Sequence, residues 1–158
     1  MQEISYRAMV EADIPEMVEI AKDAEVQKLT LFVRAKERKE PLATTFNNLL
    51  KAHEKGFFSS YSVCDGGKIV GYMCAIFYDD NPNEIHIGYW VGKHHRGRNI
   101  AQQSVQELMK DIRAVKPKCF FEAAIAPDNI ASIKTVSKLG FKSNGTDMDT
   151  KQRHFILK

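Results

Sequence analysis

The sequence predicts an α/β or α+β protein with one mixed sheet, and three observations support this class. The chain has 158 residues, which suits a single domain, 1–158, with a real core. Runs rich in β-branched and aromatic residues are separated by segments with helical periodicity. Hydrophobic residues make up 44% and charged residues 27% of the chain, an ordinary globular composition.

The N-terminal part of the chain is predicted to hold one strand and then helical segments. Residues 3–9 alternate in polarity and form the first strand. Asp13 caps the next helix, which has a proline in its first turn and apolar residues on one face. Residues 24–40 form a second, partly irregular helical region that ends in a charge cluster. A further helix begins at Pro41 and is ended by Gly56.

The rest of the chain alternates strands and helices. Three β-rich runs lie within residues 57–91, divided by an Asp-Gly-Gly turn and a looser turn, which predicts an antiparallel meander. Residues 99–115 carry apolar residues at helical spacing up to Val115. The remaining predicted elements are a strand at 119–126, a helix at 128–141 with Gly140 at its C-cap, and strands at 142–144 and 152–157.

Charge, hydropathy and cysteine content limit the function classes. The net charge of +3 is too small to argue for nucleic acid by itself. No apolar run approaches the roughly 20 residues of a membrane span, and no signal-peptide pattern is visible. The three widely spaced cysteines fit buried free thiols in a reducing compartment. We therefore expect a cytoplasmic protein with no membrane partner.

A basic turn between a predicted strand and a predicted helix is the first candidate site. Residues 93–98 hold three Lys or Arg residues and two histidines around Gly97, directly before a helix that begins near Asn99. Unpaired N–H groups and the dipole at a helix start attract anions, and glycine lets the backbone approach them closely. Arg96 and Arg98 add charged donors. The order of strand, basic glycine turn and helix therefore predicts a phosphate site.

Other phosphate and metal motifs are absent from the sequence. Neither G-x-x-x-x-G-K-[ST] nor G-x-G-x-x-G occurs. His86, His94 and His95 have no cysteine or carboxylate at a usable spacing beside them. Adjacent histidines on a basic turn rarely both bind one ion, so we expect no metal.

Two stretches resemble the GNAT superfamily of N-acetyltransferases. Arg96 to Ala101, RGRNIA, occupies the family's pyrophosphate signature [RQ]-x-x-G-x-[GA], with Asn99 where the family has glycine. Asparagine tolerates the left-handed conformation better than most residues, so the turn can survive this change. EIHIGYWVGKHHRGRNIA and APDNIASIKTVSKLGF are similar to the branch that acetylates ribosomal-protein N-termini, the Rim type.

The resemblance implies the GNAT fold, a mixed, mostly antiparallel sheet of six to seven strands flanked by helices. It also implies an N-acetyltransferase that moves the acetyl group of acetyl-CoA directly to a primary amine in a ternary complex, without a metal. The amine would belong to a protein N-terminus or to a small molecule. A second copy of the chain, giving a homodimer, is a further candidate partner.

Cofactor contacts follow from the same resemblance. The pyrophosphate would bind the backbone N–H groups from Arg96 to Ala101, and the pantetheine would run beside strand 84–91 and contact Asn129. The acetyl oxygen would accept a hydrogen bond from a backbone N–H near Val91. The full set implied is Tyr89, Trp90, Val91, Arg96, Gly97, Arg98, Asn99, Ile100, Ala101 and Asn129. For Tyr89 and Trp90, walling the acceptor pocket and packing in the core stay open as alternatives.

The candidates for the general base lie on two neighbouring strands. Glu84 and His86 share one strand face with Trp90 by the period of two, and Tyr89 is expected on the other face. Glu84 matches the family position where a carboxylate draws a proton through water. His86 has an ordinary pKa of about 6.5, suited to a base near neutrality. Glu122 on the next strand is a third candidate.

The general acid is also predicted from the resemblance. Many members carry a tyrosine seven residues after the asparagine, and here that position is Val136. Ser132, in N-x-x-S, is the Rim-type substitute and would protonate the leaving thiolate. An unassisted thiolate, with a thiol pKa of about 8.5, is the alternative.

Two other function classes remain as alternatives. The chain would be an acyl-CoA-binding regulatory domain if it binds CoA without turnover, which the change at Asn99 and the missing tyrosine favour. It would be a basic RNA- or ribosome-binding module if residues 93–98 bind phosphates with steep salt dependence. Nucleic acid is the less expected partner, because exposed aromatics are not interleaved with the basic cluster.

Overall fold

The computed structural model describes residues 3–29, 40–56 and 58–158. The strands are β1 (Ile4–Ala8), β2 (Phe58–Asp65), β3 (Lys68–Phe77), β4 (Glu84–Val91), β5 (Phe120–Ile125), β6 (Lys142–Thr146) and β7 (Arg153–Leu157). The helices are η1 (Glu11–Asp13), α1 (Ile14–Ala21), α2 (Ala24–Leu29), α3 (Leu42–Glu54), η3 (Lys93–His95), α4 (Ile100–Val115) and α5 (Ile130–Lys138). None of the helices in these ranges is long and apolar enough to cross a membrane.

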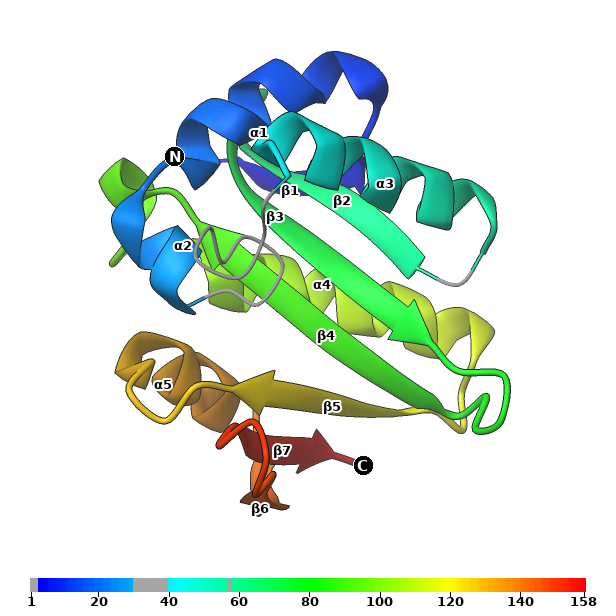
Figure 1. The fold of residues 1–158 in the computed structure, drawn as a ribbon. Helices are drawn as coiled ribbons and strands as arrows, with labels where there is room; N and C mark the ends of the chain where they lie inside the picture. The colour runs from blue at the N-terminus through cyan, green and yellow to red at the C-terminus, as the bar shows by residue number, and fades with distance from the viewer. Residues whose placement is uncertain (1–2, 30–39, 57) are drawn as a thin grey trace.

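One mixed sheet organises the described part of the chain. Its seven strands lie in the order β1-β2-β3-β4-β5-β7-β6, and each neighbouring pair is antiparallel except β4 and β5, which are parallel. β2, β3 and β4 follow one another in space as in sequence, which confirms the predicted meander. The observed architecture confirms the predicted class, a mixed and mostly antiparallel sheet flanked by helices (Figure 1).

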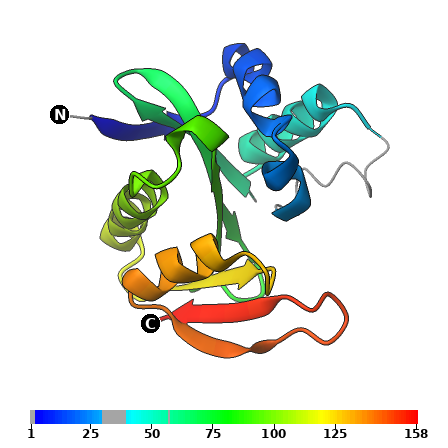
Figure 2. The same ribbon diagram turned by 90° about the vertical axis from the view of Figure 1, so that its left-hand side faces the viewer.

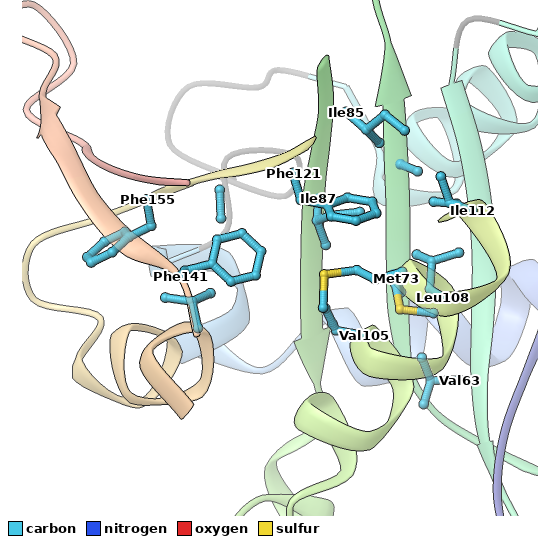
Figure 3. Packing of buried hydrophobic residues seen from close by; sticks show 14 of the residues in the cluster. Val63, Met73, Ile85, Ile87, Val105, Leu108, Ile112, Phe121, Phe141 and Phe155 are labelled. Atoms are coloured by element: carbon cyan, nitrogen blue, oxygen red, sulfur yellow. The ribbon is translucent and has the colours of Figure 1, made fainter. Parts of the chain in front are cut away.

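Helices cover both faces of the sheet and bury two hydrophobic clusters. Figure 2 shows α4 on one face and α1 and α3 on the other. The larger cluster joins β3, β4 and β5 to α4 and α5, and Figure 3 shows Leu108 and Ile112 of α4 near Met73 and Ile85 of the sheet. The second cluster places α1 and α3 against β3 and Trp90. Burying apolar surface on both faces holds the sheet rigid at its centre, where the candidate site lies.

In the described part of the chain the predicted helices and strands are observed, with ends that shift by up to three residues. The predicted helical region 24–40 is helical at Ala24–Leu29, and its later part with the charge cluster lies outside the described residues. Val115 was expected on the apolar face but is 81% exposed, because it is the last residue of α4, beyond the buried stripe that ends at Ile112. Strand 142–144 extends to Thr146 as β6.

Asp13 starts α1, as predicted, but its carboxylate does not cap the helix. It accepts two hydrogen bonds from Arg7, at 2.6 and 2.7 Å, and one from the backbone N–H of Val10. The hydroxyl of Ser62 donates a fourth at 2.8 Å. These bonds, with Arg7 making the largest contribution, lower the pKa of Asp13 to about 2. Asp13 therefore fixes the start of α1 to β1 and β2.

Candidate active site

β4 and β5 are paired over only part of their length. They pair in parallel from Glu84 opposite Phe120 to His86 opposite Glu122, where the pairing ends. β4 continues to Val91, so its edge beyond His86 has no β5 partner. Figure 1 shows the strands close at one end and diverging toward α5 and α2. Such an open strand edge can accept an extended ligand that pairs as a strand would.

The turn before α4 has the geometry expected of an anion site. Gly97 has φ 77° and Asn99 has φ 58°, both in the left-handed region. Asn99 therefore adopts the left-handed conformation that the family resemblance implied for the turn. The first hydrogen bond within α4 is donated by the N–H of Gln103 to Asn99, so the N–H groups of residues 100–102 have no acceptor in the helix. The first turn holds no acidic residue that would offset the positive end of the helix dipole.

A cleft of about 280 Å³ joins this turn to the opening between the strands. Its walls come from α2, β4, the turn before α4, the first turn of α4, and α5. The predicted site residues that line it are Tyr89, Trp90, Val91, Arg96, Gly97, Asn99, Ile100, Ala101, Asn129 and Ser132. Glu84, His86 and Arg98 are predicted site residues that do not line it.

Two hydroxyl groups meet in the cleft. Ser132 Oγ donates to the hydroxyl of Tyr89 at 2.8 Å, and the Tyr89 hydroxyl donates to the Ser132 carbonyl at 3.2 Å. Asn129 Oδ1 accepts from the N–H of Ser132 at 3.2 Å, so Asn129 caps α5. Burial raises the pKa of Tyr89 to about 12, so the phenol keeps its proton at neutral pH. Tyr89 thus brings a protonated hydroxyl into the cleft, whereas Val136 is buried in the core.

The two arginines of the basic turn bind carboxylates in this structure. Arg96 Nε donates to the Val91 carbonyl at 3.1 Å, and the guanidinium forms ion pairs with Asp23, just before α2, and with Glu25 of α2. Arg98 pairs with Asp65 of the β2–β3 hairpin at 2.6 Å. Their side chains therefore tie neighbouring segments to the turn, which offers the backbone N–H groups at the start of α4 to an anion.

Sequence reasoning did not single out two lysines of α5. Lys134 and Lys138 line the cleft, together with Ala131 and Thr135. These positions are three or four residues apart, so one face of α5 is turned toward the cleft. The signal was available in the sequence as a lysine pair at i and i+4 on the helix after Asn129. The lysines add positive charge to the lining of the cleft.

A second polar cluster lies where β4 and β5 are still paired. Glu84 Oε1 lies 2.7 Å and Glu122 Oε2 lies 3.4 Å from Nε2 of His86. Asn81 donates to Glu84 at 2.8 Å, and Glu122 lies 2.6 Å from Nδ1 of His154. The hydrogen bond with His86 is the main reason that the pKa of Glu84 is lowered. All three candidates for the base are thus brought together, and His154 of β7 joins them.

Tyr89 and Trp90 point to opposite faces of β4, as the period of two requires. The Trp90 ring stacks on Tyr72 with ring centroids 5.8 Å apart and contacts Phe46 at 6.5 Å. It is 6% exposed, so its ring belongs to the core. Of the two predicted aromatic residues, only Tyr89 offers a polar group to the cleft.

Comparison with known proteins gives one family and a consistent set of folds. A model of the acetyltransferase (GNAT) domain matches residues 4–142. An uncharacterized N-acetyltransferase, p20, from Bacillus licheniformis is 24% identical over 147 residues, which cover 91% of this chain and 82% of that protein.

Solved structures share the fold at low sequence identity. The RimL ribosomal L7/L12 alpha-N-protein acetyltransferase in complex with coenzyme A has a TM-score of 0.84 and 19% identity, covering 98% of this chain and 93% of that chain. An aminoglycoside acetyltransferase in complex with coenzyme A has a TM-score of 0.79 and 14% identity, covering 99% of this chain and 95% of that chain.

Proposed function

This chain belongs to the GNAT acetyltransferase family and is an acetyl-CoA-dependent acyltransferase, and we propose that it moves the acetyl group directly to a primary amine in a ternary complex. The observation that carries the proposal is the single cleft that connects the α4 turn with the Tyr89–Ser132 hydroxyl pair. The turn would hold the pyrophosphate, and the open edge of β4 would hold the pantetheine. The thioester would then lie beside the hydroxyl pair.

The carbonyl of the thioester must be polarised while the amine attacks. We place its oxygen at a backbone N–H of β4 near Val91, on the strand edge that has no β5 partner. A fixed donor of this kind is worth about 3 kcal/mol in the transition state. Because the N–H is part of a strand paired to β3, it needs no reorganisation during the reaction.

Two proton transfers complete the reaction. The amine loses a proton to Glu84, which Asn81 and His86 hold in place. Glu84 lies five residues before Tyr89, about 16 Å along an extended strand, so the proton would travel through water. An α-amine has a pKa near 8 and needs only modest help. Ser132 would protonate the thiolate, and the Tyr89 hydroxyl, which accepts from Ser132 Oγ at 2.8 Å, would hold it in place.

The acceptor that we propose first is the α-amine of a protein N-terminus. The Rim-type motifs of the sequence and the fold likeness to the L7/L12 N-terminal acetyltransferase support it. The likeness to an aminoglycoside acetyltransferase keeps small amines as the second acceptor class. Acceptor recognition in this fold would involve the segments around α2, where Glu25 and Val26 line the cleft.

The test is release of free CoA from acetyl-CoA against a panel of acceptors. The panel holds peptides that begin with Ser, Ala or Thr, followed by polyamines, amino acids and an aminoglycoside. Turnover on peptides alone supports N-terminal acetylation. Turnover on a small amine alone would show that the acceptor is a small molecule and not a protein N-terminus. Saturable acetyl-CoA binding without turnover on any acceptor would favour the regulatory-domain alternative, and absence of binding would contradict the site.

A further inference from the structure

The polar cluster where β4 and β5 pair has the composition of a metal site, contrary to the expectation from the sequence, because the fold brings Glu84 and Glu122 of two strands beside His86. Its ligand atoms, one each from Glu84, His86 and Glu122, all lie within 4.8 Å of one another. We propose that these three residues bind a divalent transition-metal ion of the zinc class. Imidazole nitrogen and carboxylate oxygen are the ligand types that such ions accept.

The spacing of the ligand atoms is close to what a tetrahedral ion needs. Metal–ligand bonds of about 2.0–2.1 Å place neighbouring ligand atoms about 3.3 Å apart. The distance from His86 Nε2 to Glu122 Oε2 is 3.4 Å, which already fits. The distance from His86 Nε2 to Glu84 Oε1 is 2.7 Å, so the Glu84 side chain must withdraw by about half an ångström. A rotation of that flexible side chain is enough.

The strands and the surrounding side chains orient the three ligands. His86 and Glu122 are direct partners in the β4–β5 ladder, so their backbones are fixed relative to one another. Nδ1 of His154 lies 2.6 Å from the second oxygen of Glu122, and Asn81 donates to the second oxygen of Glu84. Outer partners of this kind hold metal ligands in position and raise their affinity.

The local charge also favours a cation. In the described part of the chain, the ion pairs of Glu84 and Glu122 involve only histidines, so no Lys or Arg neutralises the two carboxylates. The side chains of His86, Glu84 and Glu122 are 22%, 26% and 13% exposed. An ion can therefore reach them from solvent, yet it would be partly shielded from water once bound.

A bound ion would occupy the groups that the proposed mechanism uses to deprotonate the amine. Zinc is therefore expected to inhibit acetyl transfer, and a chelator to restore it. The inhibition rests on the proposed function, whereas the binding itself does not. Measuring zinc binding and zinc inhibition separately shows whether the metal site or the proposed function has failed.

The first experiment is calorimetric titration of the untagged, metal-free protein with zinc chloride. We expect one saturable site, with affinity lowered tenfold or more in Glu122→Gln and in His86→Asn. His154→Gln should weaken binding about tenfold, because it removes an outer partner of Glu122. His94→Ala removes an exposed histidine elsewhere and should leave the affinity unchanged. Thermal melts of each variant establish that it is folded.

Cobalt provides a second, spectroscopic readout of the same site. Co²⁺ bound by His86 and the two glutamates should give visible d–d absorption that zinc displaces and that Glu122→Gln abolishes. Absence of saturable zinc binding to the wild-type protein would overturn the proposal. A zinc affinity equal to that of the wild-type protein in the folded variants Glu122→Gln and His86→Asn would overturn it as well, because the ion would then lie elsewhere. Calorimetry decides these points even if no acceptor amine is turned over.

Discussion

Asn99 shows how a single residue sets the geometry of the turn before α4. It occupies the left-handed region with φ 58°, at the position where the family signature has glycine. A side chain with a Cβ atom costs about 1–2 kcal/mol in this conformation, and asparagine pays less than most because its short polar side chain can bond locally. The turn is therefore kept despite the change, and with it the N–H groups at the start of α4.

Substitutions at Asn99 should show whether the turn needs only a residue that accepts positive φ or the asparagine side chain itself. Asn99→Gly is expected to keep or slightly raise stability and to leave the KM for acetyl-CoA unchanged. Asn99→Val should lower the unfolding free energy by about 1–2 kcal/mol and raise that KM, because a β-branched residue resists positive φ. Denaturant unfolding and steady-state kinetics measure the two effects. A valine variant as stable and as active as the glycine variant would contradict this account.

The hydroxyl pair in the cleft gives a second prediction at the residue scale. Ser132→Ala and Tyr89→Phe should each lower kcat about tenfold to a hundredfold with little change in the KM for acetyl-CoA, which is the low end of general-acid contributions. A thiol leaving group needs only modest assistance, so a larger loss is not expected. Tyr61→Phe, in a tyrosine that packs against Tyr6 away from the cleft, is the matched control.

If both hydroxyl variants kept full kcat, the thiolate would leave unassisted. The loss of kcat in Ser132→Ala and Tyr89→Phe should also be smaller for an acyl donor with a more acidic thiol, because a better leaving group depends less on protonation. A purely structural role of Tyr89 and Ser132 would not depend on the leaving group in this way.

At the scale of whole elements, the helices α4 and α5 bring positive groups to the cleft that no single sequence motif reveals. α5 is capped by Asn129 and turns one face, with Lys134 and Lys138, toward the cleft. The N-terminal turn of α4 lines the same cleft and offers its free N–H groups. A polyanion such as CoA would therefore be held between a helix start and a helix face.

Removing the α5 lysines should weaken cofactor binding. Each surface lysine near a phosphate is worth about 1 kcal/mol, so Lys134→Ala and Lys138→Ala should each raise the KM for acetyl-CoA about fivefold. The difference from wild type should shrink at high salt, since screening weakens such pairs. Lys142→Ala, in an exposed lysine of β6, is the control. An unchanged KM in the double variant at low salt would show that the lysines do not contact the cofactor.

The stability of the whole molecule is linked to pH through Asp13. Its pKa of about 2 in the folded state lies below the ordinary 3.8. The stabilisation is fully present above about pH 4, the unfolded value, and is lost as the pH falls toward 2. The difference corresponds to about 2 kcal/mol. Because Asp13 binds β1, Val10 and β2 together, this loss acts on the packing of α1 against the sheet.

Asp13→Asn is therefore expected to lower the unfolding free energy by about 2 kcal/mol at pH 7 and to flatten its dependence on pH between 4 and 2. Urea unfolding at a series of pH values measures both. An exposed carboxylate with no assigned role, Glu16, provides the control substitution Glu16→Gln. A pH dependence in Asp13→Asn as steep as in the wild type would assign the acid sensitivity to other carboxylates.

The sequence by itself determined the fold class, the meander, and the α4 and α5 helices. These depend on local signals: periodicity, turn residues and helix caps act over a few neighbouring residues. The resemblance to the family added the predicted anion-binding turn from Arg96 to Ala101 and its left-handed Asn99, because that motif is continuous in the chain.

Only the tertiary structure decided which side chains meet. It paired Arg96 and Arg98 with carboxylates from other segments, placed Tyr89 against Ser132, and buried Trp90. It also gathered Glu84, His86, Glu122 and His154 from three strands. These contacts depend on strand register and on where β4 and β5 diverge, and both are set by packing between residues far apart in the sequence.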